Sequence, residues 1–220
     1  EKLEAAFSSG LDQTAAVIAV LKELMEDHGN VVFGGDGYSE EWHKIAVEER
    51  GLKNIPTTAD ALPALLEDSV KALFNSTGVL SPVELESRYE VYSEQYILAI
   101  EVEAKLVIDM ATTSIYPAAM SYLSRLSNTI ASAKEIGIKL DTTTAGSVAR
   151  NTDSMMNSIS TLSEALSVHD FPSPEAHMQY CAGTICGLMV EVRGYADLLE
   201  TIVADELWPL PKYAEMLFIK

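Results

Sequence analysis

A long run of helical periodicity that begins at Ser81 constrains the fold more than any other feature of the sequence. Ser81 is suited to be an N-cap, Pro82 to be the first helical residue, and Glu84 completes a capping box. No helix stop appears before the letters EIGIKLD. Apolar or aromatic side chains recur every three or four positions, which predicts one buried helical face: Leu85, Tyr89, Tyr92, Tyr96, Ile100, Val107, Ala111, Ile115, Ala118, Tyr122, Leu126 and Ile130.

A continuous helix of roughly 55 residues would be about 80 Å long at 1.5 Å per residue. Pro117 lies inside this stretch. Its ring would clash with the carbonyl of Thr113, because a proline inside a helix crowds the carbonyl four residues earlier. We therefore expect a kink at Pro117 rather than an unbroken rod.

Two further long helices follow. One is predicted from about Thr143 to Val168, and the next begins with Ser173 as N-cap and runs to about Asp205. Their inner faces are Val148, Met155, Ile159, Leu162 and Leu166 in the first helix, and Leu188, Val192, Tyr195, Leu199 and Ile202 in the second. The sequence therefore predicts a mainly α fold, an antiparallel bundle of three or four long helices, that ends in a short helical turn after prolines.

The residues before this bundle read as a short segment of helix, strand and loop. A helix is predicted over 12–29 with Asp12 as its N-cap, and another over 39–51. Residues 31–33, two valines and a phenylalanine, are the one convincing strand candidate. Two short helical pieces separated by a break near Pro63 complete the segment.

The formal net charge of −18 over 220 residues limits the possible partners. Such a surface repels phosphate backbones and anionic lipids, so we expect neither nucleic acid nor a membrane as partner. The only two cysteines, Cys181 and Cys186, are too few for a disulfide framework and fit a reducing cytoplasm. The first residues do not resemble a signal peptide and lack an initiator methionine, so we expect the sequence to begin within a longer protein.

A glycine-rich turn, NVVFGGDGYSEEWHKIAVEERG, has the outline of a nucleotide-binding loop. A phosphate-binding loop needs a lysine directly after its last glycine, but the next lysine is Lys44, and Glu40 stands where the dinucleotide fingerprint needs a glycine. A bound phosphate would also face three carboxylates at the start of the helix: Asp36, Glu40 and Glu41. We therefore interpret Gly34, Gly35 and Gly37 as parts of a tight turn, in which glycines supply positive φ.

Metal chemistry has only partial support. Di-iron bundles use two Glu-x-x-His motifs, and the sequence has one, Glu40 with His43. His177 and Cys181 are four residues apart, so they share a helical face, but two ligands without a third make a weak site. Acidic residues of the long helix are expected to be solvated, with Glu101 paired to Lys105: Glu101, Glu103 and Asp109.

Nucleophilic chemistry has no support in the motifs. A Gly-x-Ser-x-Gly elbow is absent, and neither cysteine has an evident basic activator. Tyr89, Tyr92 and Tyr96 form an aromatic stripe, which we interpret as core or interface packing. From motif chemistry alone we predict no catalytic, no cofactor-binding and no metal-binding residue.

Three segments together resemble one family, the type III glutamine synthetases. They are VVFGGDGYSEEWHKIAVEERGLKNIPTTADALPAL, LFNSTGVLSPVELESRYEVYSEQYILAIEVEAKLVIDMATTSIYPAAMSYL and ADELWPLPKYAEMLFIK. The first two are similar to the stretch that follows the catalytic core of that family, and the third to its extreme C-terminus. The resemblance is weakest over residues 130–185.

The resemblance implies a fragment of an enzyme that makes glutamine from glutamate, ammonium and ATP with divalent metal, Mg or Mn. Its metal-binding glutamates and phosphate-binding arginines belong upstream, so no catalytic residue is carried over to this sequence. Residues 1–78 would then comprise the end of the catalytic domain, up to about residue 29, and a connecting segment, and 79–220 the long-helix C-terminal extension.

The resulting hypothesis is a non-catalytic, structural or oligomer-supporting part of a cytoplasmic glutamine synthetase, inactive by itself. Its partners would be the catalytic domain of the same chain and other subunits of a homo-oligomer. Two alternatives stay open at this point. One is a helical adaptor for another protein, and the other is a metal-binding helical bundle that uses His177 and Cys181.

Overall fold

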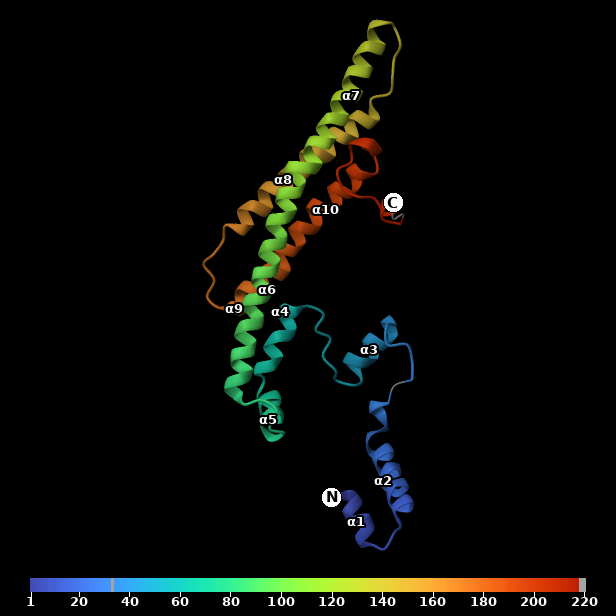
Figure 1. Ribbon diagram of the computed structural model, residues 1–220, viewed down its shortest axis with the longest axis vertical. Coiled ribbons are helices and arrows are strands. Elements are labelled where there is room, and N and C mark those ends of the chain that lie inside the picture. The colour runs from blue at the N-terminus through green and yellow to red at the C-terminus, as the bar shows by residue number, and fades with distance from the viewer. Residues whose placement is uncertain (33, 218–220) are drawn as a thin grey trace. The chain divides into compact units, whose positions relative to one another are not determined.

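The computed structural model describes residues 1–32 and 34–217, and these residues form helices and loops without a β-strand. The chain divides into two compact units, Glu1–Asn54 and Ile55–Lys220 (Figure 1). In the second unit, the short helices that follow Asn54 pack on the long helices.

The first unit consists of α1 (Lys2–Ser8), α2 (Gln13–His28), the 3₁₀ turn η1 (Gly29–Val31) and α3 (Glu40–Glu48). Helix α2 begins as predicted, because the Asp12 side chain accepts a hydrogen bond from the Ala15 amide at 2.9 Å. Among the side chains whose burial is described, only that of Ala16 is buried in this unit.

The strand predicted at 31–33 is wrong at its first residue. Val31 closes the 3₁₀ turn, and the amide of Val32 bonds back to the carbonyl of Gly29 at 3.0 Å. Val32 itself is extended, and Phe33 lies outside the described residues. A strand needs a second extended segment to pair its amides and carbonyls, and the described residues offer none to Val31 and Val32.

The second unit opens with α4 (Thr58–Ala61), the 3₁₀ turn η2 (Leu62–Leu66) and α5 (Asp68–Ser76). The break predicted near Pro63 is confirmed, since Pro63 lies in the first turn of η2. Both η2 and α5 contact α6.

Helix α6 (Pro82–Met110) starts with the predicted capping box. The Ser81 hydroxyl accepts from the Glu84 amide at 3.3 Å, and the Glu84 carboxylate accepts from the Ser81 amide at 2.7 Å. These reciprocal bonds satisfy donors that a helix N-terminus otherwise leaves unpaired.

Near Pro117, where the sequence predicts a kink, a π-turn, η3 (Ala111–Ile115), lies between α6 and α7 (Tyr116–Glu135). The amide of Tyr116 bonds to the carbonyl of Ala111, five residues earlier. This wider turn accommodates a residue that has no amide hydrogen and whose ring crowds the preceding turn. Helices α6 and α7 continue in the same general direction (Figure 1).

The remaining long helices are α8 (Thr143–Leu166) and a pair, α9 (Pro174–Tyr180) and α10 (Cys186–Glu200), joined by a second π-turn, η4 (Cys181–Ile185). The last of these helices was predicted to run to Asp205 but ends at Glu200. The amides of Ile202 and Val203 both bond to the carbonyl of Leu199, which closes the helix early. The chain continues through η5 (Asp205–Leu207) to α11 (Tyr213–Met216).

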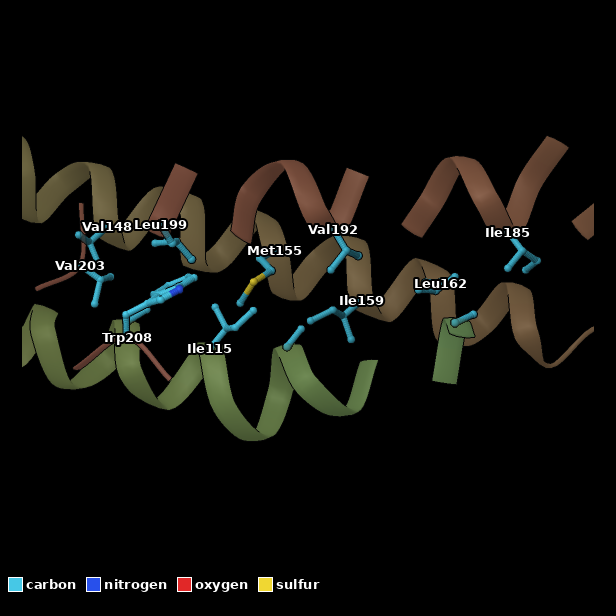
Figure 2. Packing of buried hydrophobic residues seen from close by; sticks show 13 residues of the cluster. Ile115, Val148, Met155, Ile159, Leu162, Ile185, Val192, Leu199, Val203 and Trp208 are labelled. Carbon is cyan, nitrogen blue, oxygen red and sulfur yellow. The ribbon is translucent and has the colours of Figure 1, made fainter. Parts of the chain in front are cut away.

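The predicted antiparallel bundle is formed by α6 with α7, by α8, and by α9 with α10 (Figure 1). Figure 2 shows its core, in which side chains from all three helical rods meet. Burying each large side chain contributes about 1.5–3 kcal/mol, and the predicted inner face of α8 supplies four buried members: Val148, Met155, Ile159 and Leu162. Trp208, from the segment after η5, packs against the same cluster.

A search of the described helices for a membrane-spanning segment found no stretch that is long and apolar enough.

Candidate functional site

The glycine-rich turn is held by side-chain hydrogen bonds. The Asp36 carboxylate accepts from the Tyr38 amide at 2.9 Å, and the Ser39 hydroxyl donates to the Asp36 carbonyl at 3.0 Å. Ser39 also caps α3, as predicted, by accepting from the Trp42 amide at 3.2 Å. Neither Gly34 nor Gly37 has a φ in the left-handed region. The prediction that these two glycines supply positive φ to the turn is therefore wrong. An Asx turn and a serine cap build this bend instead.

The partial metal motif of the same unit lies open to solvent. Glu40 and His43 are both exposed on α3. Across the described part of the chain, no group of three or more His, Cys, Asp or Glu side chains is arranged to hold a metal ion.

The clearest polar cluster lies where α6 meets α9. The Nε2 atom of His177 lies 3.4 Å from Oε1 of Glu101, and Lys105 Nζ lies 3.7 Å from the same carboxylate's Oε2. The predicted pairing of Glu101 with Lys105 is therefore confirmed. The expectation that Glu101 is solvated is wrong, because the packing of α9 on α6 buries most of its side chain, whereas Glu103 and Asp109 are exposed as expected.

Phe171 fixes the imidazole of His177 from the loop before α9. The two rings are stacked, with centroids 4.1 Å apart and an interplanar angle of 11°. Phe171 also contacts the ring of Tyr180, whose hydroxyl donates to the Ala165 carbonyl at 3.2 Å. This cluster ties α6, α8 and α9 together with both rings and hydrogen bonds.

Cys181 is the first residue of η4 and Cys186 directly follows η4, and neither is an activated nucleophile. Burial, with smaller contributions from Glu101 and Cys186, raises the pKa of the buried Cys181 thiol to about 11. Burial and then Glu103 raise the pKa of Cys186, against a hydrogen bond from Tyr96 that lowers it. Both groups are therefore thiols near neutral pH, whereas nucleophilic cysteines need a lowered pKa.

The predicted tyrosine stripe is split between two environments. Tyr89 and Tyr96 are half-buried as predicted, and burial raises the pKa of Tyr96. Tyr92 is 42% exposed, so its assignment to the packed face is wrong. Its hydroxyl accepts a hydrogen bond from Arg88 Nη1 at 3.4 Å on the helix surface.

Two polar links between distant residues could not be found from the sequence. Gln179 Nε2 donates to Asp60 Oδ1 at 2.8 Å and joins α9 to α4, and Ser158 Oγ donates to Glu191 Oε1 at 2.9 Å between α8 and α10. Hydrogen bonds from Thr57 and then Gln179 lower the pKa of Asp60. Neither pair has a local sequence signal, because each depends on the packing of separate helices.

One pocket of about 320 Å³ lies where η3 and α10 meet the C-terminal segment. Its apolar lining includes Ile115 and Val192, and Glu200 lies at its rim. Arg193 at the same rim pairs with Asp197, with Nε and Oδ2 3.4 Å apart. The pocket thus combines apolar side chains with an arginine that is already paired to a carboxylate.

Comparison with known proteins bears on the family. Residues 16–134 match the model described as the glutamine synthetase C-terminal domain. The chain is 32% identical over 210 residues to the type-3 glutamine synthetase of Dictyostelium discoideum, covering 91% of this chain and 28% of that protein. It is 30% identical over 221 residues to a glutamine synthetase of Bacteroides fragilis (strain YCH46), covering 96% of this chain and 30% of the relative. A glutamine synthetase of Butyrivibrio fibrisolvens is 29% identical, with 96% of this chain and 31% of that protein covered.

The chain thus spans between 28% and 31% of the length of these relatives. The first two resembling segments of the sequence fall within the matched residues 16–134, and the resemblance to type III enzymes agrees with the Dictyostelium relative. The chain belongs to the glutamine synthetase C-terminal domain family.

Proposed function

We propose that this chain is the non-catalytic C-terminal part of a glutamine synthetase and that its helical bundle supports the assembly of subunits. The ligation of ammonium to glutamate, with ATP and Mg or Mn, would then take place in the part of the enzyme that this sequence does not include. The chain alone would be inactive. Two cysteines that form no disulfide support a cytoplasmic location.

The observation that carries a role in assembly is the apolar outer surface of α6. Leu98, Val102 and Leu106 are each more than half exposed on a helix whose opposite face is already in the core. A helix that is apolar on two faces is normally covered on both. This apolar surface is therefore more consistent with a face that a partner covers than with one that stays exposed to solvent.

The first unit fits a role as the connection to the catalytic part. Ile18, Leu21 and Met25 of α2 and Phe7 of α1 are exposed, so the two helices bury little apolar area by themselves. A unit of this size needs more burial than that to offset its chain entropy. We propose that α1 and α2 pack against the catalytic domain and that the segment up to residue 78 leads from it to the long helices.

Deletion of residues 55–220 from the complete polypeptide tests the role in assembly. Light scattering should give a smaller particle for the deleted form than for the complete enzyme at equal subunit concentration. The matched control is a complete polypeptide with the exposed Val190 changed to Ala, which should assemble normally. An unchanged particle mass after the deletion would refute the proposal.

A further inference from the structure

Helix α2 carries a row of exposed apolar side chains, which we call the α2 row: Ile18, Leu21 and Met25. They are 53%, 54% and 54% exposed. Their spacings of three and four residues place them on one side of the helix. A shallow hollow of about 420 Å³ on this side is lined by the row together with Lys22 and Glu26. All five lining residues belong to α2, so no other described element of the first unit covers the row.

The opposite side of α2 is already covered, because α1 packs against it (Figure 1). Ala16 is fully buried on this side. The Nζ atom of Lys2, in α1, lies 2.8 Å from Oε1 of Glu23 and 3.6 Å from Oδ2 of Asp27. At about 100° per residue, the direction shared by Ala16, Glu23 and Asp27 is roughly 170° from that of the α2 row. A helix with apolar side chains on the side opposite its one neighbour is typical of the interior of a larger core.

The first unit needs the burial that a cover over the α2 row would provide. Among its side chains whose burial is described, only that of Ala16 is buried. Fixing the backbone of each residue costs about 1–2 kcal/mol in conformational entropy. Burying the three side chains of the row would contribute about 1.5–3 kcal/mol each. The unit therefore depends on polypeptide that this chain does not contain.

The polypeptide that precedes Glu1 is the segment best placed to supply that cover. This chain spans between 28% and 31% of the relatives that it matches, and its family is described as a C-terminal domain, so we expect most of the enzyme to precede it. Because Lys2 pairs with Glu23 and Asp27, the preceding segment enters beside the C-terminal half of α2. The α2 row lies across the same helix, which is about 10–12 Å wide with its side chains. A segment tethered this closely has a high effective concentration at the row.

A second copy of the chain fits the α2 row less well. Two chains that each have a net charge of −18 repel each other. The charged residues that flank the row are one lysine, Lys22, and one glutamate, Glu26. The row therefore has no excess of positive charge that would offset the repulsion between two copies.

We infer that α2 is an interior helix of the catalytic part, with α1 on one side and polypeptide that precedes Glu1 packed on the α2 row. The inference rests on the proposed function and deepens it, because it names the face through which the first unit joins the catalytic part. The covering segment presents an apolar surface, with a carboxylate near Lys22 and a cation near Glu26. The core of the catalytic part then extends through α2, and the connecting segment begins after this helix.

Oxidation of Met25 by hydrogen peroxide in the complete enzyme tests the cover. The thioether sulfur takes one oxygen atom from the peroxide, which becomes water, and peptide mapping measures the resulting sulfoxide. The reference is the rate for the same methionine in urea-unfolded enzyme. A covered Met25 should react at least about tenfold more slowly in the native enzyme than in the unfolded one. Equal rates would overturn the inference.

Two further conditions identify what covers Met25, with every residue of the α2 row unaltered. Protection should persist at dilutions that dissociate the enzyme, and it should persist after deletion of residues 55–220, because the cover precedes Glu1 in the same chain. Loss of protection on dilution would show that a second copy covers the row. Loss of protection after the deletion would show that the long-helix unit covers it. Either loss would overturn the inference.

Photo-cross-linking locates the covering segment directly. p-Benzoylphenylalanine in place of Leu21 in the complete polypeptide should give cross-links to residues that precede Glu1. In mixtures of light and ¹⁵N-labelled copies, these cross-linked peptides should carry a single label. Mixed-label peptides, or cross-links only to residues 55–220, would contradict the inference. The urea-unfolded enzyme is the control and should lose the specific cross-links.

The same experiments separate this inference from the proposed role in assembly. If Met25 is protected in every form while deletion of residues 55–220 leaves the particle mass unchanged, the role in assembly is wrong and the contact of α2 stands. If the deletion gives a smaller particle while Met25 of the native enzyme reacts as in the unfolded enzyme, the contact of α2 is wrong and the role in assembly stands.

Discussion

His177 Nε2 lies 3.4 Å from Glu101 Oε1, so a side chain of α9 pairs with a side chain of α6 that is 76 residues away in the sequence. Both side chains are about four-fifths buried. We expect a double-mutant cycle with E101Q and H177Q to give a coupling free energy of about 0.5–1 kcal/mol in urea unfolding. A coupling free energy of zero would mean that the two groups are neighbours without interaction.

Removing the whole ring of His177 should lower the free energy of unfolding more than removing its charge alone. His177→Ala loses the stacked contact with Phe171 as well as the pair with Glu101, and we expect a loss of about 1–2 kcal/mol in the free energy of unfolding. His43→Ala, on the exposed surface of α3, is the control and should change stability by less than about 0.5 kcal/mol. Equal effects of the two substitutions would contradict the described packing.

Truncation of a core side chain should lower the free energy of unfolding far more than truncation of a surface side chain. Leu162 is fully buried in α8, and Leu162→Ala should lower the free energy of unfolding by about 2–5 kcal/mol, because it leaves a cavity among α6, α8 and α10. Val190, 70% exposed on α10, is the matched control, and Val190→Ala should have an effect below about 0.5 kcal/mol. Thermal or urea unfolding followed by circular dichroism measures both.

The capping box of α6 should make stability depend on pH. Hydrogen bonds from the Ser81 amide and then the Ser81 hydroxyl lower the pKa of Glu84. A carboxyl with a lowered folded pKa contributes stability that is complete above its unfolded pKa and is lost as the pH falls through the folded value. The stability difference between the unaltered chain and Glu84→Gln should therefore be largest near neutral pH and shrink below about pH 4. Glu90→Gln on the same helix is the control, and a difference that grows toward low pH would contradict the account.

Cys181 should resist alkylation. A pKa raised from 9.0 to about 11 leaves roughly 100-fold less thiolate at pH 8 than in the unfolded chain, and burial slows the reagent further. Peptide mapping after timed exposure to iodoacetamide should show Cys186, which is only half-buried, modified before Cys181. Rapid modification of Cys181 in the folded chain would show that its thiol is accessible to the reagent and would contradict its burial.

The sequence predicted those parts of the fold that depend on local signals. The caps at Asp12, Ser39 and Ser81 lie where predicted, because each is a short-range contact between a side chain and an amide. Proline chemistry predicted a kink at Pro117, and the chain departs from α-helix just before that residue, over Ala111–Ile115. The form of that departure, a π-turn, depends on how the carbonyls around Ala111 rearrange, which periodicity does not show.

Predictions failed where the outcome depends on which distant segments of the chain pack together. Val31 has the composition of a strand, but no second strand pairs with it among the described residues. Glu101 belongs to an acidic helix face, and only the packing of α9 against it buries most of its side chain. Tyr92 fits the heptad-like spacing but lies at the edge of the packed face, since the core of α6 is narrower than the apolar stripe in the sequence.

The most direct test of the account is an assay of ATP-dependent glutamine synthesis by the 220-residue chain and by the complete polypeptide in parallel. Circular dichroism should first confirm that the shorter chain is helical. We predict synthesis by the complete enzyme and none above the reagent blank by the shorter chain. Glutamine formation by the folded 220-residue chain alone would contradict the proposal that these helices support chemistry performed elsewhere in the enzyme.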